Sequence, residues 1–185
     1  MMRGSPRANA TPSWNDRVGW LTLAQHYGLP TRLLDWTTSP LMALFFAVED
    51  ETNVEDGCLW ALQPLRLNEA HGLRPALVRP DEPIYTQIVD AAFDEPAGTP
   101  LGPKALATVA RQMDVRMLVQ QSAFTIHTDG SDLRRISTPS VILHKYMIPG
   151  PDKKNLRTLT RLFGLPRSLV FPELPGLSQE LGEQF

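Results

Sequence analysis

The chain has 185 residues, 42% of them hydrophobic and 21% charged, which is typical of one soluble globular domain able to bury a sizeable core. Eighteen Lys and Arg residues against 20 Asp and Glu give a formal charge of -2, which excludes a global positive field for sequence-independent binding of nucleic acid. Seventeen prolines predict short elements joined by many turns, and the single cysteine, Cys58, excludes an internal disulfide.

The amino-terminal half begins with residues 1–13, which are rich in Pro, Ser, Asn and Ala and are expected to form a disordered lead-in. A helix is predicted from Trp14 to Tyr27, with Ser13 as its N-cap and Gly28 as the residue that ends it. Because Pro30 cannot continue a helix, the run Thr31–Asp35 is expected to be a buried strand or a strand-like arm.

The next element carries the clearest helix signal in the sequence. Ser39 is a good N-cap residue, and Pro40 suits the first helical position because its fixed φ is helical and its missing N–H is not needed there. The pattern therefore predicts a helix from Pro40 to about Asp50. This helix is apolar almost all round, so we expect it to lie in the core.

The remaining patterns are less regular. Strands are predicted at 58–62, 122–128 and 141–148, and helices at 84–93, 155–163 and 174–181. Residues 104–121 have apolar side chains at helical intervals, with a turn into strand after Arg116. Helices interleaved with short strands in no regular βαβ order favour an α+β fold, with residues 14–185 forming a single compact domain.

No standard motif for a nucleotide-binding loop, a dinucleotide fold, a serine hydrolase or a zinc protease occurs in the sequence. The four histidines have no close ligand spacing, so no metal site is expected. The longest apolar stretch, Leu41–Val48, is far below the roughly 20 residues that span a bilayer, and the amino terminus has no signal-peptide pattern. We therefore expect a cytoplasmic protein with no membrane partner.

Polar and aromatic side chains are concentrated in residues 25–40, between two predicted helices. The candidate site residues in this patch are Gln25, His26, Tyr27, Thr31, Arg32, Asp35, Trp36, Thr37, Thr38 and Ser39. A connection between helices is usually shorter and plainer, which points to a functional site. Each residue also has an ordinary structural alternative: Asp35 could pair with Arg32, Trp36 could belong to the core, and a hydroxyl could cap the following helix.

The run AQHYGLPTRLLDWTTSPLMALFFAVED, residues 24–50, resembles the central signature of the FRG domain family, which is named for a Phe-Arg-Gly motif. VRMLVQQSAFTIH, residues 115–127, and LFGLPRSLVFPELPGLSQEL, residues 162–181, resemble later segments of the same family. The naming motif lies well upstream in family members, whereas here Met2-Arg3-Gly4 is its only echo. The resemblance thus implies a short or amino-terminally truncated member without that arginine.

The arm and following helix are also similar to the middle motif of Arg-Ser-Glu type ADP-ribosyltransferases, which implies a split sheet and NAD as substrate. By this resemblance Arg32 would bind phosphate, Trp36 or Tyr27 would stack on a ring, and Asp35 would supply negative charge. The hydroxyls of Thr37, Thr38 or Ser39 would bind the ribose, and Gln120 or Gln121 would take the downstream acidic position. A nucleotide-directed bacterial domain of this kind suggests a toxin or phage-defence role.

Two other function classes stay open. The first is a binding module for a nucleotide, a nucleic acid or a protein, with cations at Arg134–Arg135, Lys153–Lys154, Arg157 and Arg161. The second is a phosphodiester hydrolase with His26 as general base and Arg32 as phosphate clamp, although no matching acid or metal set accompanies them.

Overall fold

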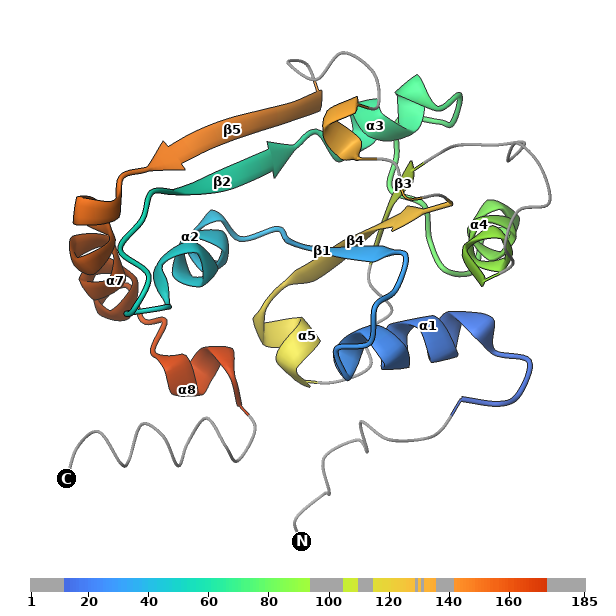
Figure 1. The fold of residues 1–185 in the computed structure, drawn as a ribbon. Helices are drawn as coiled ribbons and strands as arrows, with labels where there is room; N and C mark the ends of the chain where they lie inside the picture. The colour runs from blue at the N-terminus through green and yellow to red at the C-terminus, as the bar shows by residue number, and fades with distance from the viewer. Residues whose placement is uncertain are drawn as a thin grey trace, which may run out of the picture. The chain divides into compact units, whose positions relative to one another are not determined.

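Residues 12–93, 105–109, 115–128, 130, 132–135 and 142–172 are described by a computed structural model. The chain divides into two compact units. Unit 1 takes its described residues from 1–36, 62–113 and 123–144, and unit 2 takes them from 37–61, 114–122 and 145–185. Both units contain helices and strands, so the predicted α+β class is confirmed (Figure 1).

Unit 1 is built on a three-stranded sheet in the order β1 (Leu33–Thr37), β4 (Ser122–His127), β3 (Ala105–Val109). Strands β3 and β4 are antiparallel, with Ala107 opposite Thr125. The helices of this unit are α1 (Arg17–His26), α3 (Pro64–Ala70) and α4 (Pro83–Phe93), together with the 3-10 turn η1 (Leu133–Arg135). Helix α3 packs on β3, and α1 packs on α4.

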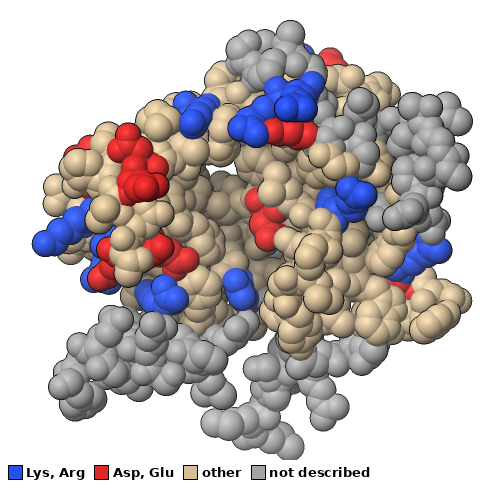
Figure 2. All heavy atoms as spheres, in the orientation of Figure 1, with Lys and Arg blue, Asp and Glu red and all other residues tan. Residues whose placement is uncertain are grey.

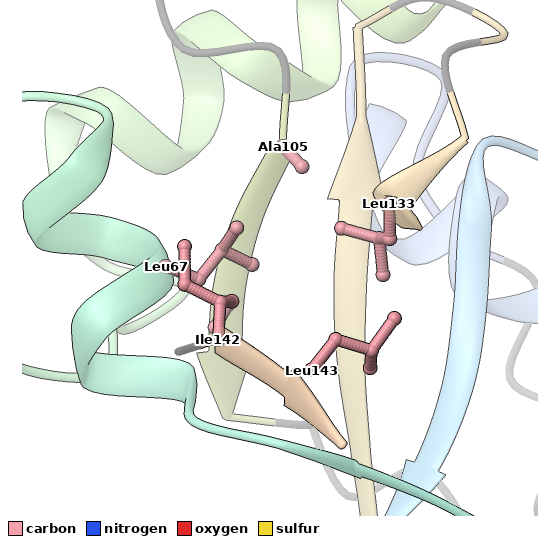
Figure 3. Packing of buried hydrophobic residues seen from close by; sticks show 6 residues of the cluster. Leu67, Ala105, Leu133, Ile142 and Leu143 are labelled. Atoms are coloured by element: carbon pink, nitrogen blue, oxygen red, sulfur yellow. The ribbon is translucent and has the colours of Figure 1, made fainter. Parts of the chain in front are cut away.

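The core of unit 1 gathers residues that are far apart in the sequence (Figure 3). Its buried members are Leu67, Ala105, Ala107, Leu133, Ile142 and Leu143. Leu67 projects from α3 toward Ile142. Trp36, at the end of β1, packs against this cluster. The strand that carries the predicted site is therefore anchored to the core by a large side chain.

Unit 2 contains α2 (Pro40–Val48), α5 (Val115–Val119), α7 (Lys153–Leu162), α8 (Arg167–Val170) and the 3-10 turn η2 (Gly150–Asp152). Strands β2 (Gly57–Leu62) and β5 (Leu143–Ile148) form a two-stranded sheet whose arrows run in opposite directions in Figure 1. Helix α2 packs on α7, and α5 packs on α8. Met42, Phe45 and Val170 form the buried cluster, with Phe171 against it.

Most predicted elements are found close to their expected positions, and among the expectations that are wrong are those for β3, for the N-cap of α1 and for the burial of α2. Residues 105–109, expected to be helical, form strand β3, because pairing with β4 overrides the helix preference of ALATV. The N-cap of α1 is Asp16, which accepts a hydrogen bond from the Gly19 N–H, and not Ser13. Helix α2 is not buried all round, since Phe46 is 38% exposed.

Three further segments differ from their prediction, were not predicted or lie outside the described residues. The stretch after Arg116, expected to turn directly into strand, stays helical through Val119 in α5 before β4 begins. Helix α3 was not anticipated, because Pro64–Ala70 lies in a stretch that reads as turns. The predicted helix at 174–181 lies outside the described residues. Among the helices that are described, none is long and apolar enough to cross a membrane.

Candidate functional site

Helix α1 ends in a Schellman motif that turns the chain toward β1. The Gly28 N–H donates to the Gln25 carbonyl, and the Leu29 N–H donates to the Ala24 carbonyl, both at 3.0 Å. Gly28 has φ +74°, a left-handed conformation that favours glycine, so its predicted role as the terminating residue is confirmed. The turn places the last residues of α1 beside the arm that leads into β1.

A side-chain network joins α1 to this arm and to β1. The Thr31 hydroxyl donates a hydrogen bond to Gln25 Oε1, and Gln25 Nε2 donates to Asp35 Oδ2 at 2.8 Å. The Thr31 hydroxyl also accepts a bond from the Leu33 N–H at 3.1 Å. The amide of Gln25 is therefore fixed in orientation between a hydroxyl and a carboxylate. Asp35 is therefore hydrogen-bonded to Gln25. The alternative, an ion pair between Asp35 and Arg32, is not found.

Trp36 is held by a second chain of hydrogen bonds within unit 1. Its indole N–H donates to the Thr125 hydroxyl at 3.1 Å, and Thr125 Oγ1 lies 3.0 Å from His127 Nε2. Thr125 is completely buried. Since the indole has only a donor, the Thr125 hydroxyl accepts from Trp36 and its own proton is available to His127. Trp36 is half-buried and serves the core as well as the candidate site.

Arg32 is the cation of this arm. Its carbonyl accepts a hydrogen bond from the His127 N–H at 2.8 Å, which holds its backbone to β4. Its side chain is exposed and has neither a hydrogen bond nor an ion pair within the described part of the chain. A Cβ built on Gly130 would lie 3.6 Å from Arg32 Nη1, so the guanidinium passes close to that glycine.

The other described arginines contrast with Arg32. Those with a carboxylate partner are Arg17, Arg66, Arg74, Arg79, Arg134, Arg157, Arg161 and Arg167. Arg116 rests on the ring of Phe171. Within the ranges that the structure describes, only Arg32 and Arg135 lack any such side-chain contact. Arg32 is thus one of two described arginines with neither a carboxylate nor an aromatic ring as partner.

His26 and Tyr27 lie at the carboxyl end of α1. Their rings contact each other edge-on, with centroids 5.2 Å apart. His26 is half-buried, whereas Tyr27 is 62% exposed. An exposed phenol ring can stack on a planar group of a ligand.

The other predicted site residues belong to unit 2, where they hold the turn before β4. The Thr37 hydroxyl donates to the Gln120 carbonyl at 2.7 Å, and the Thr38 N–H donates to the Gln121 carbonyl at 3.0 Å. The Thr38 hydroxyl lies 3.3 Å from Gln121 Oε1. The Ser39 hydroxyl accepts from the Met42 N–H, which confirms Ser39 as the N-cap of α2. The hydroxyls of Thr37 and Ser39 thus have structural partners.

Both glutamines are tied into the same turn. Gln120 Nε2 donates to the Val170 carbonyl at 3.1 Å. Gln121 has φ +49°, a left-handed conformation that is uncommon outside glycine, and it is the only such residue in the part of the chain that is described. The structure thus brings Thr37 together with Gln120 and Thr38 with Gln121. The convergence of these residues with Arg32, which the transferase hypothesis requires, stays a prediction.

The match to known families falls on this same region of the chain. A family model for the FRG domain covers residues 2–56. The chain therefore carries an FRG domain segment. This finding confirms the predicted resemblance over α1, β1 and α2, and the FRG segment contains every candidate site residue except Gln120 and Gln121. No curated protein and no solved structure matches the chain.

Three residues near the FRG segment were missed by sequence reasoning. Thr125, His127 and Gly130 contact Trp36 and Arg32, and they come from β4 and the turn after it. The alternation in SAFTIH was a usable signal, because it places Thr125 and His127 on one face of a strand. The sequence did not indicate that this strand would pair with β1.

Three of the six predicted cationic side chains have a carboxylate partner in the described chain. Arg157 and Arg161 lie within ion-pair distance of Glu51, and Arg134 pairs with Asp132. The hydrogen bonds from Arg134 lower the pKa of Asp132 to about 2. On the face drawn in Figure 2, blue and red groups are interspersed and no continuous basic stripe is visible. No group of three or more His, Cys, Asp or Glu side chains that could hold a metal occurs among the described residues.

Proposed function

We propose that the part of the FRG segment that lies in unit 1 binds a nucleotide and that NAD is its substrate. The observation that carries the proposal is the guanidinium of Arg32, which is exposed and unpaired within the described chain although its backbone is fixed to β4. A guanidinium fits a phosphate through two parallel hydrogen bonds, and binding costs little reorganisation when no ion pair has to break.

Two other side chains of unit 1 suit the remaining parts of a nucleotide. Tyr27 supplies an exposed ring for stacking on a base or on nicotinamide. Asp35 accepts one hydrogen bond from Gln25 through Oδ2, and its side chain is exposed, so it has acceptor capacity left for ribose hydroxyls. The same carboxylate would stabilise positive charge that develops on the ribose.

The reaction that this arrangement supports is transfer of ADP-ribose. The bond between the nicotinamide nitrogen and the ribose carbon breaks, and nicotinamide leaves with the bonding electron pair. The resulting oxocarbenium-like carbon is then captured by a nucleophile of a target or by water, which loses a proton. The first outcome is ADP-ribosyl transfer, and the second is hydrolysis of NAD.

Saturation-transfer NMR of the purified chain with NAD tests the proposal, with ATP as the comparison ligand. We expect saturation of the nicotinamide and ribose protons of NAD, loss of that signal in Arg32→Ala, and no change in Arg135→Ala. Arg135 is a matched control because it is the other exposed arginine with neither a carboxylate nor an aromatic partner in the described ranges. Release of free nicotinamide in the same sample would show that the chain is an enzyme.

Two results separate the competing classes. Equal signals from NAD and ATP, lost in Arg32→Ala without release of nicotinamide, would identify a binding module for nucleotides and remove the transferase. Absence of any signal that depends on Arg32 would overturn nucleotide binding by this segment. Gly130→Val adds an independent check, because a larger side chain there would crowd Arg32 Nη1 and should weaken binding in the same direction.

A further inference from the structure

A second group of positive charge lies in unit 2, around the ring of Phe171. The guanidinium carbon of Arg116 is 5.2 Å from the ring centroid, and that of Arg167 is 5.0 Å from it. The ring itself contacts Phe45 and Phe46 at centroid distances of 6.2 and 6.1 Å. A ring fixed by two aromatic neighbours holds both arginines in defined places.

The charges in this cluster do not balance. Arg167 Nη1 donates to Glu49 Oε2 at 2.9 Å, so one guanidinium has a carboxylate partner. Arg116 has neither an ion pair nor a hydrogen bond to any residue in the described ranges. Two positive charges on one ring are therefore offset by a single negative charge. A bound anion would remove the excess.

The donors of Arg116 are also open to solvent. No buried side-chain nitrogen or oxygen lacks a hydrogen-bond partner in the described chain. Because Arg116 is half-buried and has no such partner, its donor nitrogens must be reachable by water. The contact with Phe171 limits the motion of the Arg116 side chain. Unlike an ion pair with a carboxylate, this contact does not occupy the N–H groups of the guanidinium. Such a planar fork is prepared for two parallel bonds to an oxyanion.

From this arrangement we infer that Arg116, supported by Phe171 and Arg167, forms a phosphate-binding site in unit 2. The ligand class is a tetrahedral phosphate, either free or as a monoester, because its two or three oxygens match the guanidinium fork. Arg167 adds attraction at longer range and keeps Glu49 as its own partner. The inference does not depend on nucleotide binding by unit 1.

The test is a titration of the isotopically labelled chain with inorganic phosphate at constant ionic strength, following the side-chain N–H resonances of arginine. We expect a saturable shift of the Arg116 resonance and a much smaller one for Arg135, which reports nonspecific screening. Calorimetry should show binding about tenfold or more weaker in Arg116→Gln, the loss expected for one charge-assisted contact. Ribose 5-phosphate in place of phosphate tells whether a monoester is preferred.

Two variants keep the inference falsifiable. Arg116→Lys keeps the charge but loses the fork, and Phe171→Leu keeps both arginines but loses the ring, so both should weaken phosphate binding while Arg135→Gln leaves it unchanged. An Arg116 shift no larger than that of Arg135 would overturn the site. So would phosphate affinity that is the same in Arg116→Gln and in the parent chain.

Discussion

Replacing the buried Asn68 by alanine should be among the most destabilising single substitutions in unit 1. Asn68 follows Leu67 on α3 and is completely buried. Its Oδ1 accepts from the Ala107 N–H at 2.8 Å, and its Nδ2 donates to the carbonyls of Ala107 at 2.9 Å and Ala76 at 2.7 Å. The side-chain amide thus pairs with both polar groups of Ala107 as a neighbouring strand would.

The magnitude follows from these three bonds. In Asn68→Ala the Ala107 carbonyl keeps the Val78 N–H at 3.3 Å, but the Ala107 N–H loses its partner. A buried donor without a partner costs about 1–3 kcal/mol, and each of the two other lost bonds costs about 1 kcal/mol. We therefore expect the free energy of unfolding to fall by about 3–5 kcal/mol, a large part of the roughly 5–15 kcal/mol typical of a domain.

Urea unfolding followed by circular dichroism measures this loss, with Asn155→Ala as the control. Asn155 is exposed on α7, and its replacement should change the unfolding free energy by less than about 0.5 kcal/mol. Asn68→Asp is a useful companion because it keeps the shape but turns a donor into an acceptor facing two carbonyls. A loss below about 1 kcal/mol in Asn68→Ala would refute the argument, since it would mean that the Ala107 N–H finds another partner.

Three further predictions concern the turns and pH. Gly28→Ala should lower the stability by about 1 kcal/mol through its left-handed φ alone, since a Cβ there meets nothing within 4 Å, and thermal unfolding of Gly28→Ala beside Ala24→Gly measures it. Gly150→Ala should cost more, about 1–3 kcal/mol, because its Cβ would overlap the Val54 carbonyl; a loss equal to that of Gly28→Ala would contradict the steric argument. The folded-state pKa of Asp132 is about 2 against the ordinary 3.8, so the pairing of Asp132 with Arg134 contributes stability above about pH 4 and loses it as the pH falls toward 2. A smaller loss of stability over that interval in Asp132→Asn than in the parent chain is the expected result, and parallel curves would argue against it.

The elements around the candidate site were predictable because their signals are local. Ser39 and Pro40 fix the start of α2 by capping and by a fixed φ, and Gly28 fixes the end of α1 by a conformation that other residues avoid. Strand β3 could not be predicted in the same way. It is buried on both faces except at its end, so its sequence does not alternate, and its pairing with β4 and Asn68 involves residues far away in the chain.

The candidate site shows the same division. The sequence placed Gln25, Thr31 and Asp35 in one patch, and their hydrogen bonds join them over short separations. It did not indicate that Thr125 would hold the indole of Trp36, or that Gly130 would lie beside Arg32. Those contacts depend on which strand pairs with β1. Contacts between residues close in the sequence can therefore be predicted from the sequence, whereas contacts that depend on strand pairing cannot.

The hydrogen bond between Trp36 and Thr125 gives the protein a built-in optical reporter. The indole of Trp36 is held in place by the hydrogen bond from its nitrogen, and Trp36 is the residue after Asp35 in the sequence. Its fluorescence emission should therefore respond to changes at the candidate site. Trp14, by contrast, is 92% exposed and adds a background that ligand binding at β1 would leave unchanged. A titration can therefore be followed by intrinsic fluorescence, with Trp36→Phe identifying the part of the signal that comes from β1.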